Sequence, residues 1–429
     1  MMGAQLLMLS MTFVDNMMVG RLGRDTLAGL AIAGGFYSFA QVIMIGVLGA
    51  VSPLASQAYG KESFERVGFI ARQGFIFTLI LSLILAIGLH WAEDLLLLMG
   101  QQTDLVPIAG NYLKAMIWAV PFQLSYTMLR QISEATGASM QSMTIGLLAA
   151  MLNIPLDYVL IYGKFGFPAL GVAGAGYATA AVSALMCFTL VIHMTRHRHF
   201  HVLKIWQGGF RPHLPTLLDI VKVGIPLGSA VGAEMTFFVG STFLMGTIGA
   251  NELAAHQIAL NAASIVFMIP LGLSFAISVR MGQFVGKGDM QAARTVWLAG
   301  LVIVTATQSV TALLFLLTPD FIIALYGQTA DVALLGRDLL FIAALFQLFD
   351  GLQVVGMGAL RGLKQGTYAF FAAFSAFWVG GAAVVWWFYV QSPPSPVGIW
   401  LGLLTGLLLA AIMHHGRILY ISKASRESI

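Results

Sequence analysis

Charged side chains are scarce in this sequence. Only 9% of its 429 residues are Asp, Glu, Lys or Arg, whereas 59% are hydrophobic. Soluble domains carry about 25% charged residues, and a globule of this size could not cover its surface with so few. The composition therefore excludes a soluble fold and indicates an integral membrane protein.

The chain also has a single cysteine, Cys187. One cysteine allows no internal disulfide and gives no thiolate metal site. The Walker A, HExxH, GxSxG and Rossmann fingerprints are all missing, which argues against an ATPase or a hydrolase. We therefore expect a protein that is not an enzyme and that needs no cofactor.

Short alternating segments, the signature of a porin-like barrel, are missing as well. A barrel strand is about 10 residues of alternating polarity, whereas this chain has continuous apolar runs about twice that long. In lipid, a helix satisfies all of its backbone N–H and C=O groups within its own segment. The spans are therefore helices, and the expected fold class is an all-α membrane protein.

Twelve apolar windows predict twelve transmembrane helices. We expect them at residues 1–19, 29–53, 68–92, 105–129, 139–163, 170–195, 216–246, 253–279, 295–317, 332–358, 366–390 and 397–420. Because twelve is an even number, both termini should lie on the same side of the membrane.

The Lys and Arg residues divide unevenly between the two sides. Of the 22 in the chain, 17 fall on one side of the predicted topology and five on the other, namely Arg21, Arg24, Lys114, Lys164 and Arg337. The base-rich side is cytoplasmic by the positive-inside rule, and it faces anionic membrane lipid. We therefore expect a protein of the cytoplasmic (inner) membrane with both termini in the cytoplasm, and no nucleic-acid partner.

The longest cytoplasmic connection divides the chain into two halves. It is a basic stretch that begins at Arg196, and it predicts an amino-terminal lobe at 1–195, a linker at 196–215 and a carboxyl-terminal lobe at 216–429. Each lobe would contain six of the twelve predicted helices.

The two halves also carry an internal repeat. At an offset of 226, Gly20–Lys61 aligns without a gap with Gly246–Lys287, and 14 of the 42 positions are identical. With six helices in each half, the lobes should share one orientation and be related by an axis along the membrane normal, as in transporters whose lobes rock about a midplane site. Pro226 aligns one residue before Met1, so we expect the first helix to lack its cytoplasmic end and the true start to lie upstream.

Four acidic residues fall inside predicted helices. They are Asp15, Asp157, Glu234 and Asp350. An acid at a helix centre costs about 2.5–3.5 kcal/mol on insertion scales, so each is a candidate functional residue. The alternative is that each acid is protonated and hydrogen-bonded to a nearby Ser or Thr, which is a minority interpretation for four acids together.

Asn153 and Asp157 are four residues apart and share one helix face, with Pro155 between them. A proline inside a helix frees a backbone carbonyl, so this face offers carboxylate, amide and carbonyl oxygens together. Oxygen ligands at a broken helix suit Na⁺, and a protonatable carboxylate suits H⁺ equally well. The sequence leaves both ions open.

In the second half, Glu234 and Asp350 occur among Phe237, Phe238, Phe346 and several methionines. An acidic cavity lined by aromatic and thioether groups would attract a lipophilic cation through charge and cation–π contacts. We expect about two in three of these aromatic side chains to be lipid-facing or packing residues instead.

Three motifs resemble the multidrug and toxic compound extrusion (MATE) family. They are VDNMMVGRLG at Val14–Gly23, NIPLDY at Asn153–Tyr158 and ALRG at Ala359–Gly362. The resemblance covers essentially the whole chain, including the two six-helix halves. The acids Glu234 and Asp350 make it similar to the NorM-type branch.

The resemblance implies a MATE-like fold and a monomeric antiporter that exports lipophilic, mostly cationic drugs and dyes while Na⁺ or H⁺ enters. It maps an amino-lobe cation site onto Asp15, Asn153, Asp157 and Thr179. It maps a carboxyl-lobe site onto Glu234 and Asp350, with Phe346 as the aromatic neighbour of the substrate.

Two other functions remain as alternatives. A flippase of lipid-linked precursors should present a cationic cavity to a pyrophosphate headgroup, whereas the intramembrane charges of this sequence are acidic. An intramembrane enzyme would need a nucleophile and base or a metal site at membrane depth, and His90, His193 and His256 are dispersed along the chain. The coupling ion, the natural substrate and the stoichiometry stay open.

Overall fold

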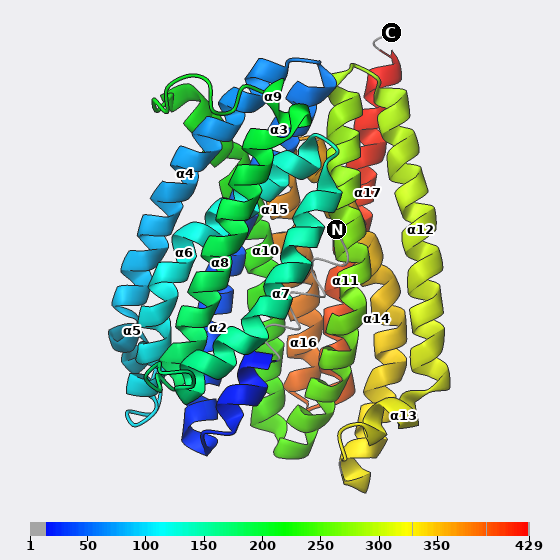
Figure 1. Cartoon of the computed structure of the whole chain (residues 1–429). Coiled ribbons are helices and arrows are strands. Elements are labelled where there is room, and N and C mark those ends of the chain that lie inside the picture. The colour runs from blue at the N-terminus through cyan, green and yellow to red at the C-terminus, as the bar shows by residue number, and fades with distance from the viewer. Residues whose placement is uncertain (1–13, 328, 392, 428–429) are drawn as a thin grey trace. The chain divides into compact units, whose positions relative to one another are not determined.

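The computed structural model describes residues 14–327, 329–391 and 393–427, which form helices joined by turns and loops, with no strand among them. They form two compact units, one that extends to Gly224 and one that begins at Ile225 (Figure 1). We refer to them as unit 1 and unit 2 and describe each by itself.

Unit 1 begins with a helical stretch at residues 14–20. It continues with α2 (Arg24–Leu48), α3 (Val51–Gly60), α4 (Phe64–His90), α5 (Ala92–Leu98), α6 (Val106–Ala135), α7 (Ser139–Tyr162), α8 (Val172–Arg196), α9 (Arg198–His201) and the first turns of α10 (Leu214–Ile248).

Unit 2 contains the rest of α10. It continues with α11 (Ala250–Gly286), α12 (Met290–Leu317), α13 (Pro319–Ala324), α14 (Ala330–Gly362), α15 (Gly366–Phe374), the π-helical stretch η1 (Ser375–Gly381), α16 (Ala382–Tyr389) and α17 (Pro396–Glu427).

Ten described helices are long and apolar enough to cross a membrane. α6, with 30 residues, is long enough as well, but its many polar side chains, which are buried within unit 1, lower its hydropathy. These helices correspond to eleven of the twelve predicted spans. Most of the first predicted span, 1–19, lies outside the described residues, which begin with its last turns at Val14.

Two details differ from the predicted spans. The window at 29–53 is two helices, because the chain breaks between α2 and α3 at Gly49 and Ala50. The short helices α5, α9 and α13 were not predicted, since seven, four and six residues are too few to give a periodic signal.

The internal repeat reappears in the helix bounds. The span Arg24–Gly60 and the helix Ala250–Gly286 both contain 37 residues, and both their starts and their ends are displaced by the same offset of 226. A glycine precedes each. Gly23 has a φ of 135°, a conformation that only glycine adopts readily.

One helix is central to each unit. α6 packs against α2, α3, α4 and α8 in unit 1, and α14 packs against α11, α12 and α17 in unit 2. The contact of α14 with α11 is close, because a Cβ atom at Gly358 would lie 2.4 Å from the Ser274 carbonyl oxygen. Small residues at this spacing let two helix backbones approach each other.

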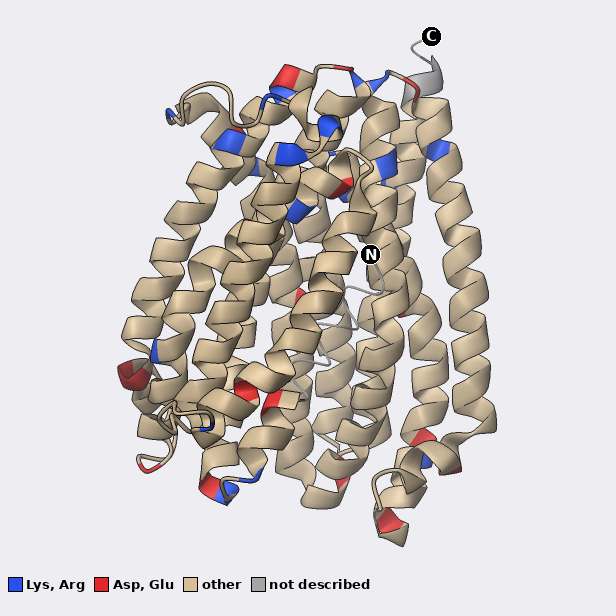
Figure 2. Ribbon diagram, in the orientation of Figure 1, with Lys and Arg blue, Asp and Glu red and all other residues tan. Residues whose placement is uncertain are grey.

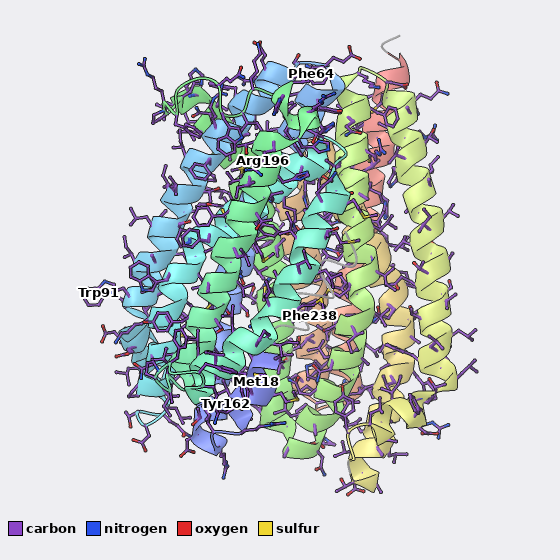
Figure 3. The ribbon with its side chains drawn as sticks, viewed as in Figure 1. Met18, Phe64, Trp91, Tyr162, Arg196 and Phe238 are labelled. Atoms are coloured by element: carbon purple, nitrogen blue, oxygen red, sulfur yellow. The ribbon has the colours of Figure 1, made fainter. Side chains whose placement is uncertain are left out.

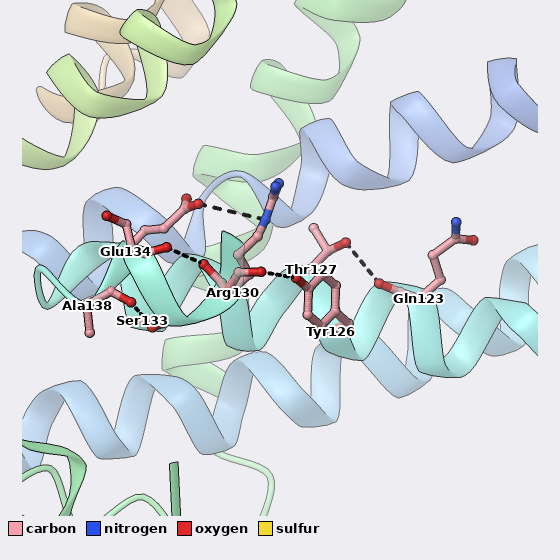
Figure 4. Close-up of polar contacts among 9 residues, drawn as sticks. Gln123, Tyr126, Thr127, Arg130, Ser133, Glu134 and Ala138 are labelled. Carbon is pink, nitrogen blue, oxygen red and sulfur yellow. Dashed lines mark hydrogen bonds and ion pairs between the residues drawn. The ribbon is translucent and has the colours of Figure 1, made fainter. Parts of the chain in front are cut away.

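α6 carries an ion pair inside unit 1. Arg130 and Glu134, one turn apart, face each other with 3.9 Å between the guanidinium and carboxylate atoms, and both side chains are less than 10% exposed (Figure 4). Because the two charges compensate each other, the helix can hold both away from water.

The predicted linker is ordered against α4. The Arg72 guanidinium donates to the carbonyl oxygens of Lys204 (2.7 Å), Ile205 (3.1 Å) and Gln207 (2.9 Å). Lys204 in turn pairs with Glu65 at 2.6 Å. In unit 1 most Lys and Arg residues gather with this linker at one end of the helices (Figure 2), as a positive-inside protein requires.

Candidate functional site

Three predicted site residues come together in unit 1. Asp15 of the stretch at 14–20 and Asn153 and Asp157 of α7 are all buried, with exposed fractions of 8%, 1% and 0%. The Asn153 amide donates a hydrogen bond to the Asp157 carboxylate, and Asp15 lies within hydrogen-bonding reach of both. We call these three side chains the amino-lobe cluster.

Local sequence explains how the cluster is held. Pro155 lies inside α7 between Asn153 and Asp157, and its missing N–H leaves one carbonyl of the preceding turn without its usual donor. The Tyr162 hydroxyl, near the end of α7, donates to the Met18 carbonyl oxygen at 2.7 Å (Figure 3). This bond fixes the stretch that carries Asp15 against the helix that carries the other two residues.

The cluster presents oxygen atoms without partners. One side-chain oxygen each of Asp15, Asn153 and Asp157 is buried with no hydrogen bond. None of the described Lys or Arg residues forms an ion pair with either acid, and the hydrogen bonds found for the cluster are internal to it rather than to Ser or Thr. Such a donor set fits a hard cation or a proton.

Thr179, the fourth residue predicted for the amino-lobe site, has no hydrogen bond to the amino-lobe cluster in the part of the chain that the structure describes. It lies on α8 and is half-buried.

In unit 2 the two predicted acids lie on neighbouring helices. Glu234 of α10 is half-buried, and Asp350 of α14 is 5% exposed. The two carboxyl groups interact electrostatically. The amide of Gln353, a residue that sequence reasoning missed, donates to Glu234 at 3.1 Å. We call Glu234, Asp350 and Gln353 the carboxyl-lobe cluster.

Aromatic rings surround this cluster. Phe346, one turn before Asp350, meets Phe238 edge to face at 5.9 Å between ring centroids and meets Trp400 at 5.5 Å. Trp378 of η1 donates to the Ala233 carbonyl oxygen at 3.0 Å, beside Glu234. An acidic pair with π-faces nearby can hold an organic cation.

Trp400 is itself held by a buried histidine. Its indole N–H donates to Nδ1 of His256 at 3.1 Å, and Nε2 of His256 lies 2.9 Å from the Thr242 hydroxyl.

Gln353 could have been found from the sequence, because it lies one helical turn after Asp350. Trp400 and His256 are far from Glu234 and Asp350 in the sequence, and no sequence pattern connects them with these acids.

Comparisons with known proteins identify the family of this chain. The family model MatE matches residues 1–159 and 226–387, one segment in each half of the chain. The chain belongs to the MatE family. The prediction of this family from the three motifs is confirmed, and so is its NorM-type branch.

Several curated relatives carry the NorM name. A probable multidrug resistance protein NorM of Pseudomonas putida is 34% identical over 414 residues, which are 95% of this chain and 90% of the relative. The protein of the same name in Rhizobium meliloti is 36% identical over 420 residues, 97% of this chain and 90% of the relative.

Solved structures share the fold. One of them is a crystal structure of MATE in the bent conformation, with a TM-score of 0.90 and 19% sequence identity. The match covers 100% of this chain and 94% of the chain in that structure. The predicted fold class, an all-α membrane protein with a MATE-like fold, is thereby confirmed, and the described residues contain eleven of its twelve predicted spans. The Pseudomonas putida relative is named as a multidrug resistance protein and one solved neighbour as a eukaryotic MATE transporter, and neither is named as an enzyme.

Proposed function

We propose that this MatE chain is a secondary multidrug antiporter, which exports lipophilic, mostly cationic compounds in exchange for Na⁺ or H⁺. The observation that carries the proposal is the pair of acidic clusters, one in each unit, whose acids are buried or half-buried without a Lys or Arg partner among the described residues. The drug-resistance names of the relatives support the substrate class.

The amino-lobe cluster is the proposed coupling-ion site. Asp15, Asn153 and Asp157 offer buried oxygens that lack hydrogen-bond partners, and leaving such atoms unsatisfied costs about 1–3 kcal/mol each. A cation or a proton that enters would recover this energy. Thr179 of α8 remains a candidate for a fourth oxygen ligand.

The carboxyl-lobe cluster is the proposed site for the drug and for cation competition. Glu234 and Asp350 would attract a positive charge, and Phe346 would stack against an apolar ring beside it. In an exchange mechanism the coupling cation and the drug must favour different states, because a ligand shifts an equilibrium only through differential affinity.

The distribution of Lys and Arg supports an inner-membrane protein with both termini in the cytoplasm. A flippase of anionic lipid precursors is less well supported, because the charged residues of both candidate clusters are acids and would repel a pyrophosphate headgroup.

Everted membrane vesicles that contain the chain test the proposal. Ethidium should accumulate in them when a Na⁺ or a pH gradient is imposed, and comparing the two gradients identifies the ion. Asp15→Asn and Asp157→Asn should abolish gradient-driven accumulation, whereas Asp25→Asn, an exposed acid of α2, should not. Unchanged transport in both cluster variants would contradict the amino-lobe site.

A further inference from the structure

A pocket lies at the base-rich end of unit 1, where α4 begins next to the linker. It has a volume of about 490 Å³, and pockets that hold small ligands have about 300–1,000 Å³. Residues 62–66, in the turn between α3 and α4 and in the first turn of α4, line it together with Val202 and Lys204 of the linker. We call it the linker pocket. It is separate from both acidic clusters, which share no residue with it.

The linker pocket contains charges of both signs, and two of them have no partner. Lys204 pairs with Glu65 at 2.6 Å. Glu62 and Arg66 form no ion pair among the described residues, and the Arg66 guanidinium lies over the Phe69 ring, 5.1 Å from its centroid. The pocket therefore offers one carboxylate and one guanidinium to a ligand. A molecule with one positive and one negative group is complementary to this pair.

The backbone at Glu62 supports a role for its side chain. Glu62 has a φ of 59°, in the left-handed region where residues other than glycine are uncommon. It follows α3 in a Schellman motif, in which its N–H donates to the Tyr59 carbonyl oxygen and the next N–H donates to that of Ala58. The internal repeat places Gly288 at the equivalent position of unit 2, with a φ of 79° and the same two hydrogen bonds. Unit 1 thus has an exposed carboxylate where the backbone alone favours glycine.

The linker side of the pocket is fixed by the protein itself. Lys204 also has a left-handed backbone, with a φ of 50°. The Arg72 guanidinium holds this conformation, because it donates to the carbonyl oxygens of Lys204, Ile205 and Gln207. A ligand would therefore enter a preformed pocket, which lowers the cost of ordering side chains on binding.

The position of the pocket favours a membrane lipid as the ligand. α4 is long and apolar enough to span a membrane, and it begins at Phe64, which lies at the base-rich end of the helices (Figure 3). The end of a span is the level at which lipid headgroups lie. Phe64 and Val202 give the pocket an apolar part, and Val202 is 54% exposed. These two side chains can cover the upper acyl region of a lipid while the charged groups hold its headgroup.

We propose that the linker pocket binds the headgroup of a zwitterionic phospholipid that carries a primary ammonium group. Arg66 holds the phosphate, because a guanidinium can donate two parallel hydrogen bonds to it. Lys204 has three N–H groups, so it can bond the phosphate and keep Glu65. The Glu62 carboxylate accepts the N–H groups of the ammonium. A choline headgroup cannot make this last contact, because a quaternary ammonium has no N–H. The site is independent of the antiport proposed above.

Native mass spectrometry of the purified full chain, titrated with single lipids, tests the proposal. Phosphatidylethanolamine should bind about three- to fivefold more tightly than phosphatidylcholine or phosphatidylglycerol with the same acyl chains, which is the range that an exposed ion pair gives. Soluble phosphoethanolamine should bind more weakly than the lipid, because it lacks the apolar part. Equal binding of the three lipids would overturn the proposal. Soluble phosphoethanolamine that binds as tightly as the lipid would overturn the assignment to a lipid.

Two substitutions connect this preference to the pocket. Glu62→Gln should remove the preference for the ethanolamine over the choline lipid, and Arg66→Gln should weaken the binding of both lipids. Lys61→Gln and Asp219→Asn are matched controls, because both residues are exposed and neither lines the pocket. These two variants should bind lipid as the wild type does. Losses as large in the controls as in the pocket variants would contradict the site.

Glu62→Gly separates binding from folding. Glycine adopts a positive φ without strain, and it occupies the equivalent position of unit 2, so this variant should unfold at the wild-type temperature or above it. It should nevertheless lose the preference for the ethanolamine lipid, because the carboxylate is gone. A Glu62→Gly variant that keeps the preference would contradict the role of Glu62.

Discussion

The Gln353 amide donates to Glu234 across 3.1 Å, and this bond joins α14 to α10 next to Asp350. A hydrogen bond to a charged group contributes about 1.5–3 kcal/mol, so Gln353 fixes the position of the acid that we assign to the drug.

Gln353→Leu should weaken transport of cationic dyes by about tenfold, because ~1.4 kcal/mol of lost interaction is a factor of ten. The measurement is the concentration dependence of ethidium transport. Gln347→Leu is the matched control, since Gln347 is also fully buried on α14 but bonds Gln308. Equal loss in both variants would mean that Gln353 acts only through packing.

Glu234→Gln and Asp350→Asn should reduce the transport of cationic substrates by about tenfold more than that of neutral ones, because a charge interaction of ~1.4 kcal/mol is lost only for the cations. Competition assays with a cationic and a neutral substrate of similar size measure this difference. The control is Asp338→Asn, because Asp338 is an exposed acid of α14. This variant should leave the transport of both substrates unchanged. Equal losses for the two substrates would argue against direct recognition of charge.

Trp400→Phe should raise KM for aromatic dyes several-fold while kcat changes little. The substitution keeps a ring against Phe346 but leaves Nδ1 of His256 without its donor, which costs about 1–3 kcal/mol. Trp386→Phe, at a tryptophan that is 64% exposed, is the control. A fall in kcat at constant KM would contradict a positioning role for Trp400.

Arg130→Met should destabilise the folded protein by about 3–5 kcal/mol, because it leaves the buried Glu134 carboxylate without its partner. The double variant Arg130→Met/Glu134→Gln should recover most of this loss. Thermal unfolding in detergent measures both variants. If the double variant is as unstable as the single one, the ion pair is not the reason for the loss.

The sequence was sufficient to predict the spans because 20-residue apolar runs are a strong signal, and their positions agree with eleven described helices. It missed the break at Gly49 and the helices α5, α9 and α13, which depend on packing rather than on periodicity.

Asn153 and Asp157 could be placed together because they lie one turn apart on α7. The meeting of Asp15 with them depends on tertiary contacts such as Tyr162 with Met18, which no local pattern contains.

The unit 2 network was harder to predict for the same reason. Gln353 lies one turn from Asp350, but His256 of α11 and Trp400 of α17 come from distant parts of the chain. Glutamine and histidine give no hydropathy signal that separates a satisfied core residue from a functional one.

The measurement that tests the exchange mechanism most directly uses liposomes that contain only the purified chain. An outward gradient of ethidium should drive Na⁺ or H⁺ into the liposomes, and an imposed gradient of that ion should drive ethidium the opposite way, because coupling between two ligands is reciprocal. Asp157→Asn should lose both fluxes. Ethidium movement without a counterflow of either ion would contradict antiport.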